Sequence, residues 1–166
     1  MKEKALPILC LLAAAGLQAN LPAGFHILGS GPDLVLVVLI AFSLAADTNA
    51  GLLLGFSAGL IEGSVVGASL GSFIVTRTIV GFAAGVSTTT FFSVNPIVSI
   101  LSTGWLTLAC EFLFVLANPA ASLFVAARRI AGECIWNSLL SLILVIILRY
   151  FRTRRKIRLA DEIAIF

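Results

Sequence analysis

The chain has 166 residues, of which 60% are hydrophobic and only 11% are charged. Charged residues make up about a quarter of an ordinary soluble domain, so this chain has too few of them to cover a water-facing surface. The composition therefore excludes an ordinary soluble protein and predicts a single integral membrane domain. The net charge of +3 comes mainly from the C-terminal end, a local patch that does not indicate a nucleic acid partner.

The first half of the chain predicts four helices joined by short connections. Lys2 and Lys4 precede an apolar run without a convincing cleavage site, which favours a retained first helix over a removed signal peptide. The next segment holds two prolines, three glycines and His26, and predicts a loop outside the cytoplasm. Asp33 then opens an apolar helix, where its side chain can satisfy free N–H groups. The expected helices span residues 5–21, 33–46, 50–66 and 68–85.

Glycine recurs at every fourth position from the start of the third helix: Gly51, Gly55, Gly59, Gly63, Gly67 and Gly71. The first four stay within a stripe of about 120° on a helix, where small residues let a neighbouring backbone approach closely. They predict a packing face that either receives another protein's transmembrane helix or positions the helices that do. Beyond Gly63 the run becomes polar and predicts a hairpin into the fourth helix.

The second half of the chain predicts two further membrane spans. A polar connection over residues 87–95 leads to a fifth helix over residues 96–117. Residues 120–132 are expected to form an interfacial or half-inserted helix, and residues 134–148 the last span. Because both ends of the chain are basic, the positive-inside rule places both in the cytoplasm, which requires an even number of spans. We therefore expect six.

Four polar residues fall inside the expected spans. Arg77 lies near the middle of the fourth helix, where an unpaired charge costs about 2.5–3.5 kcal/mol, so it needs a partner. Glu62 is the favoured partner, with Glu111 as the alternative. Such a pair either locks the helices together or serves as a switch, an ion path or a polar docking point. Asn137 in the last helix is expected to form a hydrogen bond between helices.

The basic cluster at the C-terminal end predicts contact with lipid head groups on the cytoplasmic side. It divides the chain into a polytopic membrane domain, residues 1–152, and a short basic cytoplasmic tail, residues 153–166. The anchoring side chains are expected to be Arg152, Arg154, Arg155, Lys156 and Arg158.

The sequence gives little support for catalysis. It has no Gly-x-Ser-x-Gly elbow, no phosphate-binding loop and no His-Glu-x-x-His motif. Cys10, Cys110 and Cys134 are isolated in apolar context, as ordinary buried cysteines are. We therefore predict a protein that is not an enzyme and that carries no cofactor or metal.

Several motifs together resemble the MreD family of rod shape-determining proteins. They include a Pro-Asp pair before an apolar helix, a glycine-rich helix ending in an acid, and a last helix containing Asn. Glu62 stands where Asp is commoner in the family, a Pro expected soon after it is absent, and Arg77 is not part of the pattern. The similarity covers roughly residues 32–150 and rests on Pro32-Asp33, Gly51 to Gly55, Gly59 to Glu62, Leu70-Gly71, Val80 to Phe82 and Ile135 to Leu140.

The resemblance implies a non-enzymatic protein of the bacterial inner membrane that belongs to the cell-elongation (Rod) complex. Its implied partners are the bitopic protein MreC, the actin-like MreB and a glycosyltransferase–transpeptidase pair that makes peptidoglycan. The implied fold is an all-α bundle of about six transmembrane helices, similar to the substrate-binding subunits of energy-coupling vitamin transporters. That similarity supplies the alternative function, a subunit that captures a vitamin or another small molecule. A third alternative is a structural membrane subunit of another assembly.

Overall fold

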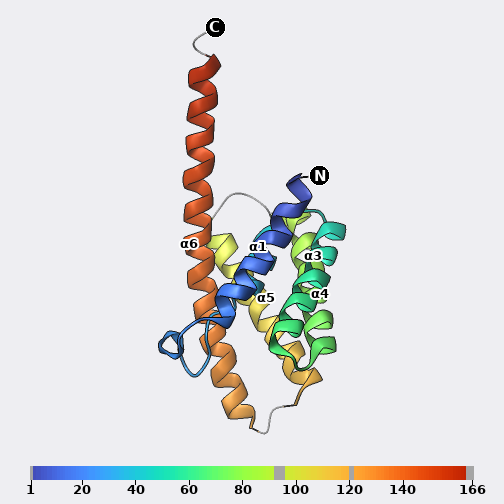
Figure 1. The fold of residues 1–166 in the computed structure, drawn as a ribbon. Coiled ribbons are helices and arrows are strands. Elements are labelled where there is room, and N and C mark those ends of the chain that lie inside the picture. Colours follow the sequence, from blue (N-terminus) through green and yellow to red (C-terminus); the bar gives the residue numbers. More distant parts are fainter. Residues whose placement is uncertain (1, 92–95, 120–121, 164–166) are drawn as a thin grey trace.

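A computed structural model describes residues 2–91, 96–119 and 122–163, with the backbone alone for residues 2–4, 23, 88–91, 96, 98, 145 and 147–163. The described part forms six α-helices and one short 3-10 turn, η1, and the helices run alternately up and down the bundle (Figure 1). The elements are α1 (Lys2–Ala19), η1 (Ala23–Phe25), α2 (Leu34–Ser43), α3 (Thr48–Val66), α4 (Leu70–Phe91), α5 (Pro96–Ala117) and α6 (Leu123–Ile163).

The short helix α2 forms the centre of the bundle. It contacts every other α-helix, and Val35, Leu36, Leu39 and Ile40 are completely buried. A helix that is apolar on all sides is either a membrane span or a core helix, and the burial of α2 shows that it is a core helix. Its ten residues extend only about 15 Å, which is half the thickness of the ~30 Å hydrocarbon core of a bilayer, so α2 is too short to cross it alone.

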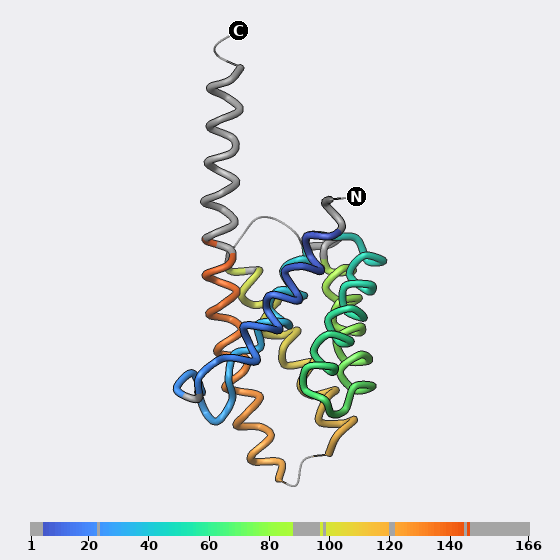
Figure 2. The backbone as a smooth tube through the Cα atoms, viewed as in Figure 1, coloured from blue at the N-terminus to red at the C-terminus, as the bar shows by residue number. Residues whose placement is uncertain are grey.

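The expected hairpin lies between α3 and α4, which run side by side in Figure 2 and make the most extensive helix contact. α3 ends where Gly67 adopts a left-handed conformation, with φ of +70°, and donates its N–H to the Gly63 carbonyl. A residue without Cβ takes this conformation at little cost, so glycine stops the helix here. Leu70 then begins α4. The glycine run therefore does span a helix, its turn and the start of the next helix.

Two of the expected helix boundaries are wrong. α4 continues to Phe91, into the segment expected to be a polar connection. Residues 120–132 and 134–148 are not separate elements, because one helix, α6, runs unbroken from Leu123 to Ile163. The two expected ranges were separated at residue 133, yet Gly132 and Glu133 both continue the helix. Glycine lowers helix propensity by only about 1 kcal/mol, which tertiary contacts readily offset.

The beginning of α1 and the end of α6 lie at the same end of the bundle, while the α3–α4 turn and the end of α5 lie at the other (Figure 1). By length and composition, three helical segments in the described part of the chain are apolar enough to cross a membrane: Thr48–Val66, Leu70–Ser87 and Ser99–Ala117. Ala5–Ala19 and Leu34–Ser43 are shorter apolar segments. α6 also passes without interruption through residues 152 and 153, where the tail was expected to begin. The side chains of Arg152, Arg154, Arg155, Lys156 and Arg158 lie outside the described part.

Candidate functional site

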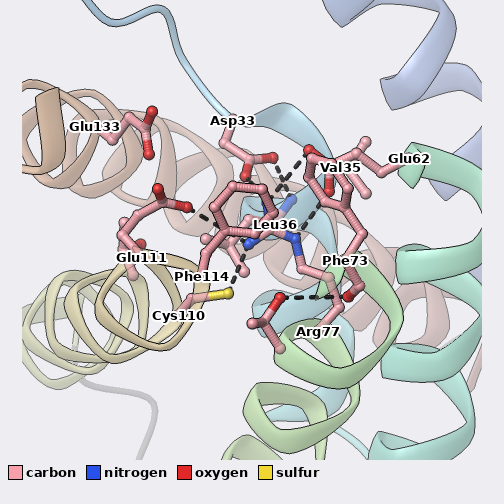
Figure 3. A network of polar contacts seen from close by, with 12 residues as sticks. Asp33, Val35, Leu36, Glu62, Phe73, Arg77, Cys110, Glu111, Phe114 and Glu133 are labelled. Carbon is pink, nitrogen blue, oxygen red and sulfur yellow. Dashed lines mark hydrogen bonds and ion pairs between the residues drawn. The ribbon is translucent and has the colours of Figure 1, made fainter. Parts of the chain in front are cut away.

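Arg77 is the centre of a buried polar network inside the bundle (Figure 3). Its side chain is only 2% exposed. The Nε atom donates to the Glu62 carboxylate at 2.8 Å, and one terminal nitrogen donates to Asp33 at 2.5 Å. The other terminal nitrogen donates to the Cys110 sulfur and lies 3.8 Å from Glu111. A buried guanidinium needs such partners because its five N–H donors have no water to bond.

The structure answers which acid pairs with Arg77. Glu62, the favoured partner, makes the direct ion pair, while Glu111 lies further away. Asp33 also makes a direct ion pair, which was not foreseen because Asp33 was expected only to start a helix. It does both, since one of its carboxylate oxygens accepts from the Leu36 N–H at 2.8 Å. The first turn of α2 is thereby tied directly to α4.

Gln18 on α1 extends the network in two directions. Its side-chain amide donates to Glu62 at 3.3 Å, and its oxygen accepts from the Val35 N–H at 3.1 Å. A helix start leaves several N–H groups without partners inside the helix. Gln18 and Asp33 together satisfy two of those at the start of α2.

A polar seam joins α5 to α6, and Asn137 lies in it as expected. Asn137 donates to Thr107 at 3.3 Å, and its oxygen accepts from the Asp33 N–H at 3.0 Å. Along the same seam Thr103 donates to Ser141 at 2.9 Å. Hydrogen bonds of this kind hold membrane helices together where lipid provides no hydrophobic drive.

A second arginine, Arg129 on α6, lies at the edge of the network and was not foreseen. Its guanidinium is 3.4 Å from Glu111 and 3.7 Å from Glu133, and its side chain is 45% exposed. The neighbouring Arg128 donates to the Leu28 carbonyl at 3.0 Å, which fastens the α1–α2 loop to α6. Each of the two arginines has a partner in the structure.

The sequence did contain a signal for these partners. Ser99, Thr103, Thr107 and Glu111 recur every four residues on α5, and Arg129, Glu133, Asn137 and Ser141 do the same on α6. Residues four apart share a helix face, so each set forms a polar stripe, and the two stripes meet in antiparallel order. The stripe on α6 was hidden by the expected break near residue 133.

The glycine stripe faces α4 over the whole length of α3. A Cβ on Gly55 would lie 2.8 Å from the Thr78 Cα, and one on Gly59 would lie 2.5 Å from the Ile74 Cα. A Cβ on Gly51 would meet the Gly81 carbonyl, and one on Gly63 would meet Leu70. The stripe is therefore filled by a helix of the same chain. It leaves no open groove for a partner, so the stripe can act on a partner only by positioning α3 and α4.

A cavity of about 510 Å³ lies beside the network, between the α1–α2 loop and the α3–α4 turn. Arg77, Arg129 and four carboxylates line it, together with residues of the α1–α2 loop and the α3–α4 turn. Helices α3, α4, α5 and α6 all contribute side chains to its lining.

A model of the rod shape-determining protein MreD family matches residues 4–155, nearly the whole chain. Comparisons with curated proteins and with solved structures gave no match. The family match and the apolar helices agree with the motifs from Pro32 to Leu140. The chain therefore belongs to the MreD family of rod shape-determining proteins, bacterial membrane proteins that form part of the MreBCD cell-shape system and are not known as enzymes.

Proposed function

We propose that this chain is a non-enzymatic inner-membrane subunit of the bacterial cell-elongation complex. In this role it binds a single-span partner of the MreC type, and through that complex it helps control peptidoglycan synthesis and cell shape. Family membership supports the cell-shape role. The glycosyltransferase–transpeptidase pair and MreB are the further partners that this proposal includes.

The observation that carries the binding role is an apolar groove between α5 and α6. It has a volume of about 850 Å³, and four of the five lining residues on α6 are small, Ile130 being the exception: Ala127, Ala131, Cys134 and Ser138. Opposite them lies Gly104, whose own Cβ would be 3.1 Å from the Ser138 hydroxyl. Small side chains let a neighbouring helix approach closely, and close contact is the main source of helix association in lipid. Unlike the glycine stripe, this groove is not filled by another helix of the chain.

The test is co-purification of the MreC-type partner from native membrane with variants of the groove. Ala131→Leu adds three carbon atoms at an exposed position of the groove, so we expect it to insert normally and to recover at least tenfold less partner. Val75→Leu is the matched control, because Val75 is 57% exposed on α4 and does not line the groove. Undiminished recovery with both Ala131→Leu and Ala127→Leu would show that the partner binds elsewhere.

One observation favours the alternative function, a subunit that captures a small molecule. The 510 Å³ cavity is large enough for a vitamin-sized ligand, and ionisable side chains line it. Tight, saturable binding of a vitamin by the purified protein would support this alternative. The groove experiment would then show whether the same chain also holds a partner.

A further inference from the structure

The cavity beside Arg77 has more acidic than basic groups in its lining. Four carboxylates and two guanidinium groups contribute to it: Asp33, Glu62, Glu111, Glu133, Arg77 and Arg129. All four carboxylates are at least 87% buried at the side chain. A buried charge is costly unless an opposite charge or several hydrogen bonds compensate it.

The two arginines compensate this charge unequally. Arg77 is enclosed and engages Asp33 and Glu62 at hydrogen-bond distance. Arg129 is 45% exposed and is shared by Glu111 and Glu133, at 3.4 and 3.7 Å. These distances are too long for strong charge-assisted bonds. Glu111 also lies 3.8 Å from Arg77, and Glu133 accepts a hydrogen bond from the neutral Ser30 hydroxyl at 2.5 Å, which adds no positive charge. The Glu111–Glu133 side of the cavity is therefore where one more positive charge would gain most.

Aromatic rings complete the lining. Phe73 and Phe114 have ring centroids 4.8 Å apart, and the Phe73 ring already contacts the Arg77 guanidinium at 5.7 Å. Phe25 also lines the cavity, from the loop. Carboxylates beside aromatic faces form a setting that favours organic cations over metal ions, because the rings attract positive charge but supply no ligand atoms.

We propose that this cavity binds an ammonium or guanidinium group, held by Glu133 and Glu111 against the aromatic rings. The group can be carried by a small organic cation or by a lysine or arginine side chain of a partner segment that enters from the loop end of the bundle. The proposal does not depend on the α5–α6 groove, so the two can fail separately.

Binding can be measured through Trp136, whose ring lies 6.3 Å from that of Phe25. The chain has two tryptophans, so the full chain carrying Trp105→Phe in a non-ionic detergent reports on Trp136 alone. The small-molecule probe is phenethylamine, with phenethyl alcohol as its neutral counterpart. The peptide probe is acetyl-Gly-Lys-Gly-amide, with acetyl-Gly-Gln-Gly-amide as its neutral counterpart. We expect saturable binding of at least one cationic probe, about tenfold tighter than its neutral counterpart.

Two variants test the assignment in opposite directions. Glu133→Gln removes one carboxylate and should weaken the cationic probe about tenfold, whereas Arg129→Gln removes a competing guanidinium and should strengthen it. A purely structural role would not change the affinity in opposite directions. Asp47→Asn is the control, because Asp47 caps α3 outside the cavity and Asn caps a helix equally well.

The outcomes separate the two sources of the cation. Tighter binding of the amine than of the peptide assigns the cavity to a free organic cation, and the reverse assigns it to a basic side chain of a partner. Equal binding of charged and neutral probes, or no saturable binding of either cation, would overturn the proposal. If Glu133→Gln does not fold, the Arg129→Gln variant decides alone, and unchanged or weakened binding of the cation would overturn it.

Discussion

At the scale of single residues, Arg77 determines how the interior is arranged. Its guanidinium contacts acids that precede α2 or lie on α3 and α5, so one side chain connects four helices. A buried network of this kind contributes little net stability compared with apolar packing, but breaking it at one member is costly. We infer that its main effect is to select one arrangement of the helices.

The first prediction concerns the charge balance around Arg77. Arg77→Ala should destabilise the protein by about 3–5 kcal/mol, because it leaves two acids buried without their cation. Adding Asp33→Asn should recover part of this loss, since Asn still caps α2 but carries no charge. The measurement is thermal unfolding of the purified protein in detergent.

The control for this experiment is Asp47→Asn, the same substitution at the start of α3, where the side chain accepts from the Ala50 N–H at 2.7 Å. In the double variant, the changes in stability caused by Asp47→Asn and by Arg77→Ala should add. Additivity of Arg77→Ala with both Asp33→Asn and Glu62→Gln would contradict the pairing.

At the scale of helices, the closest contact in the described structure is the α3–α4 hairpin. Gly55 and Gly59 on α3 and Gly81 on α4 bring the two backbones together, and a Cβ on Gly81 would lie 2.9 Å from the Gly55 Cα. Both ion-pairing residues Glu62 and Arg77 lie on these helices. The hairpin therefore positions the charge network as well as the packing surface.

The second prediction is that Gly55→Ile lowers the yield of folded protein instead of blocking partner binding selectively. The added side chain would meet the backbone at Arg77 and Thr78, which cannot move without separating the helices. We expect a loss of at least about 3 kcal/mol, the upper end for overpacking by a few methylenes. The measurement is size-exclusion chromatography of the variant fused to a fluorescent protein, which reports how much folded protein remains after heating.

The control for the hairpin is Gly71→Ala on α4, where a Cβ would meet no atom within 4 Å. Because alanine favours the helix by up to about 1 kcal/mol over glycine, this variant should be neutral or slightly stabilising. A fully folded Gly55→Ile protein that loses only its partner would mean that α4 does not fill the glycine stripe.

At the scale of the whole molecule, the six alternating helices of the described part place the beginning of α1 and the end of α6 at one end of the bundle (Figure 1). The basic residues near both termini favour the cytoplasm for that end. The cavity and the α1–α2 loop would then face the opposite side of the membrane. This topology is a proposal that reporter fusions can test.

The third prediction follows from that topology. A phosphatase that works only in the periplasm should be inactive when fused after Phe166 and active when inserted at Gly24, in the loop. Gly24 is an exposed position where a Cβ would meet nothing within 4 Å, so the insertion should be tolerated. An active C-terminal fusion would exclude the six-span topology with cytoplasmic ends.

The sequence by itself determined the membrane class, the hairpin and the need for a partner to Arg77. These follow from composition and from residues close in the chain, such as Gly67 after the α3 stripe or Glu62 fifteen positions before Arg77. The family was indicated by the resemblance of motifs between Pro32 and Leu140. The partner of Arg77 and the interhelical hydrogen bond of Asn137 could be expected because an unpaired polar group is costly wherever it lies in a membrane.

The tertiary structure alone decided which distant groups meet. Asp33 is 44 residues from Arg77 and already had a local role as a cap, so nothing nearby in the chain pointed to a second partner. The continuity of α6 depends on contacts with α5 and with the loop, which outweigh the weak helix propensity at Gly132. The cavity exists because Asp33 and residues of α3, α4, α5 and α6 bring charged groups to one place, and contacts between residues so far apart in the chain cannot be predicted from a local sequence pattern.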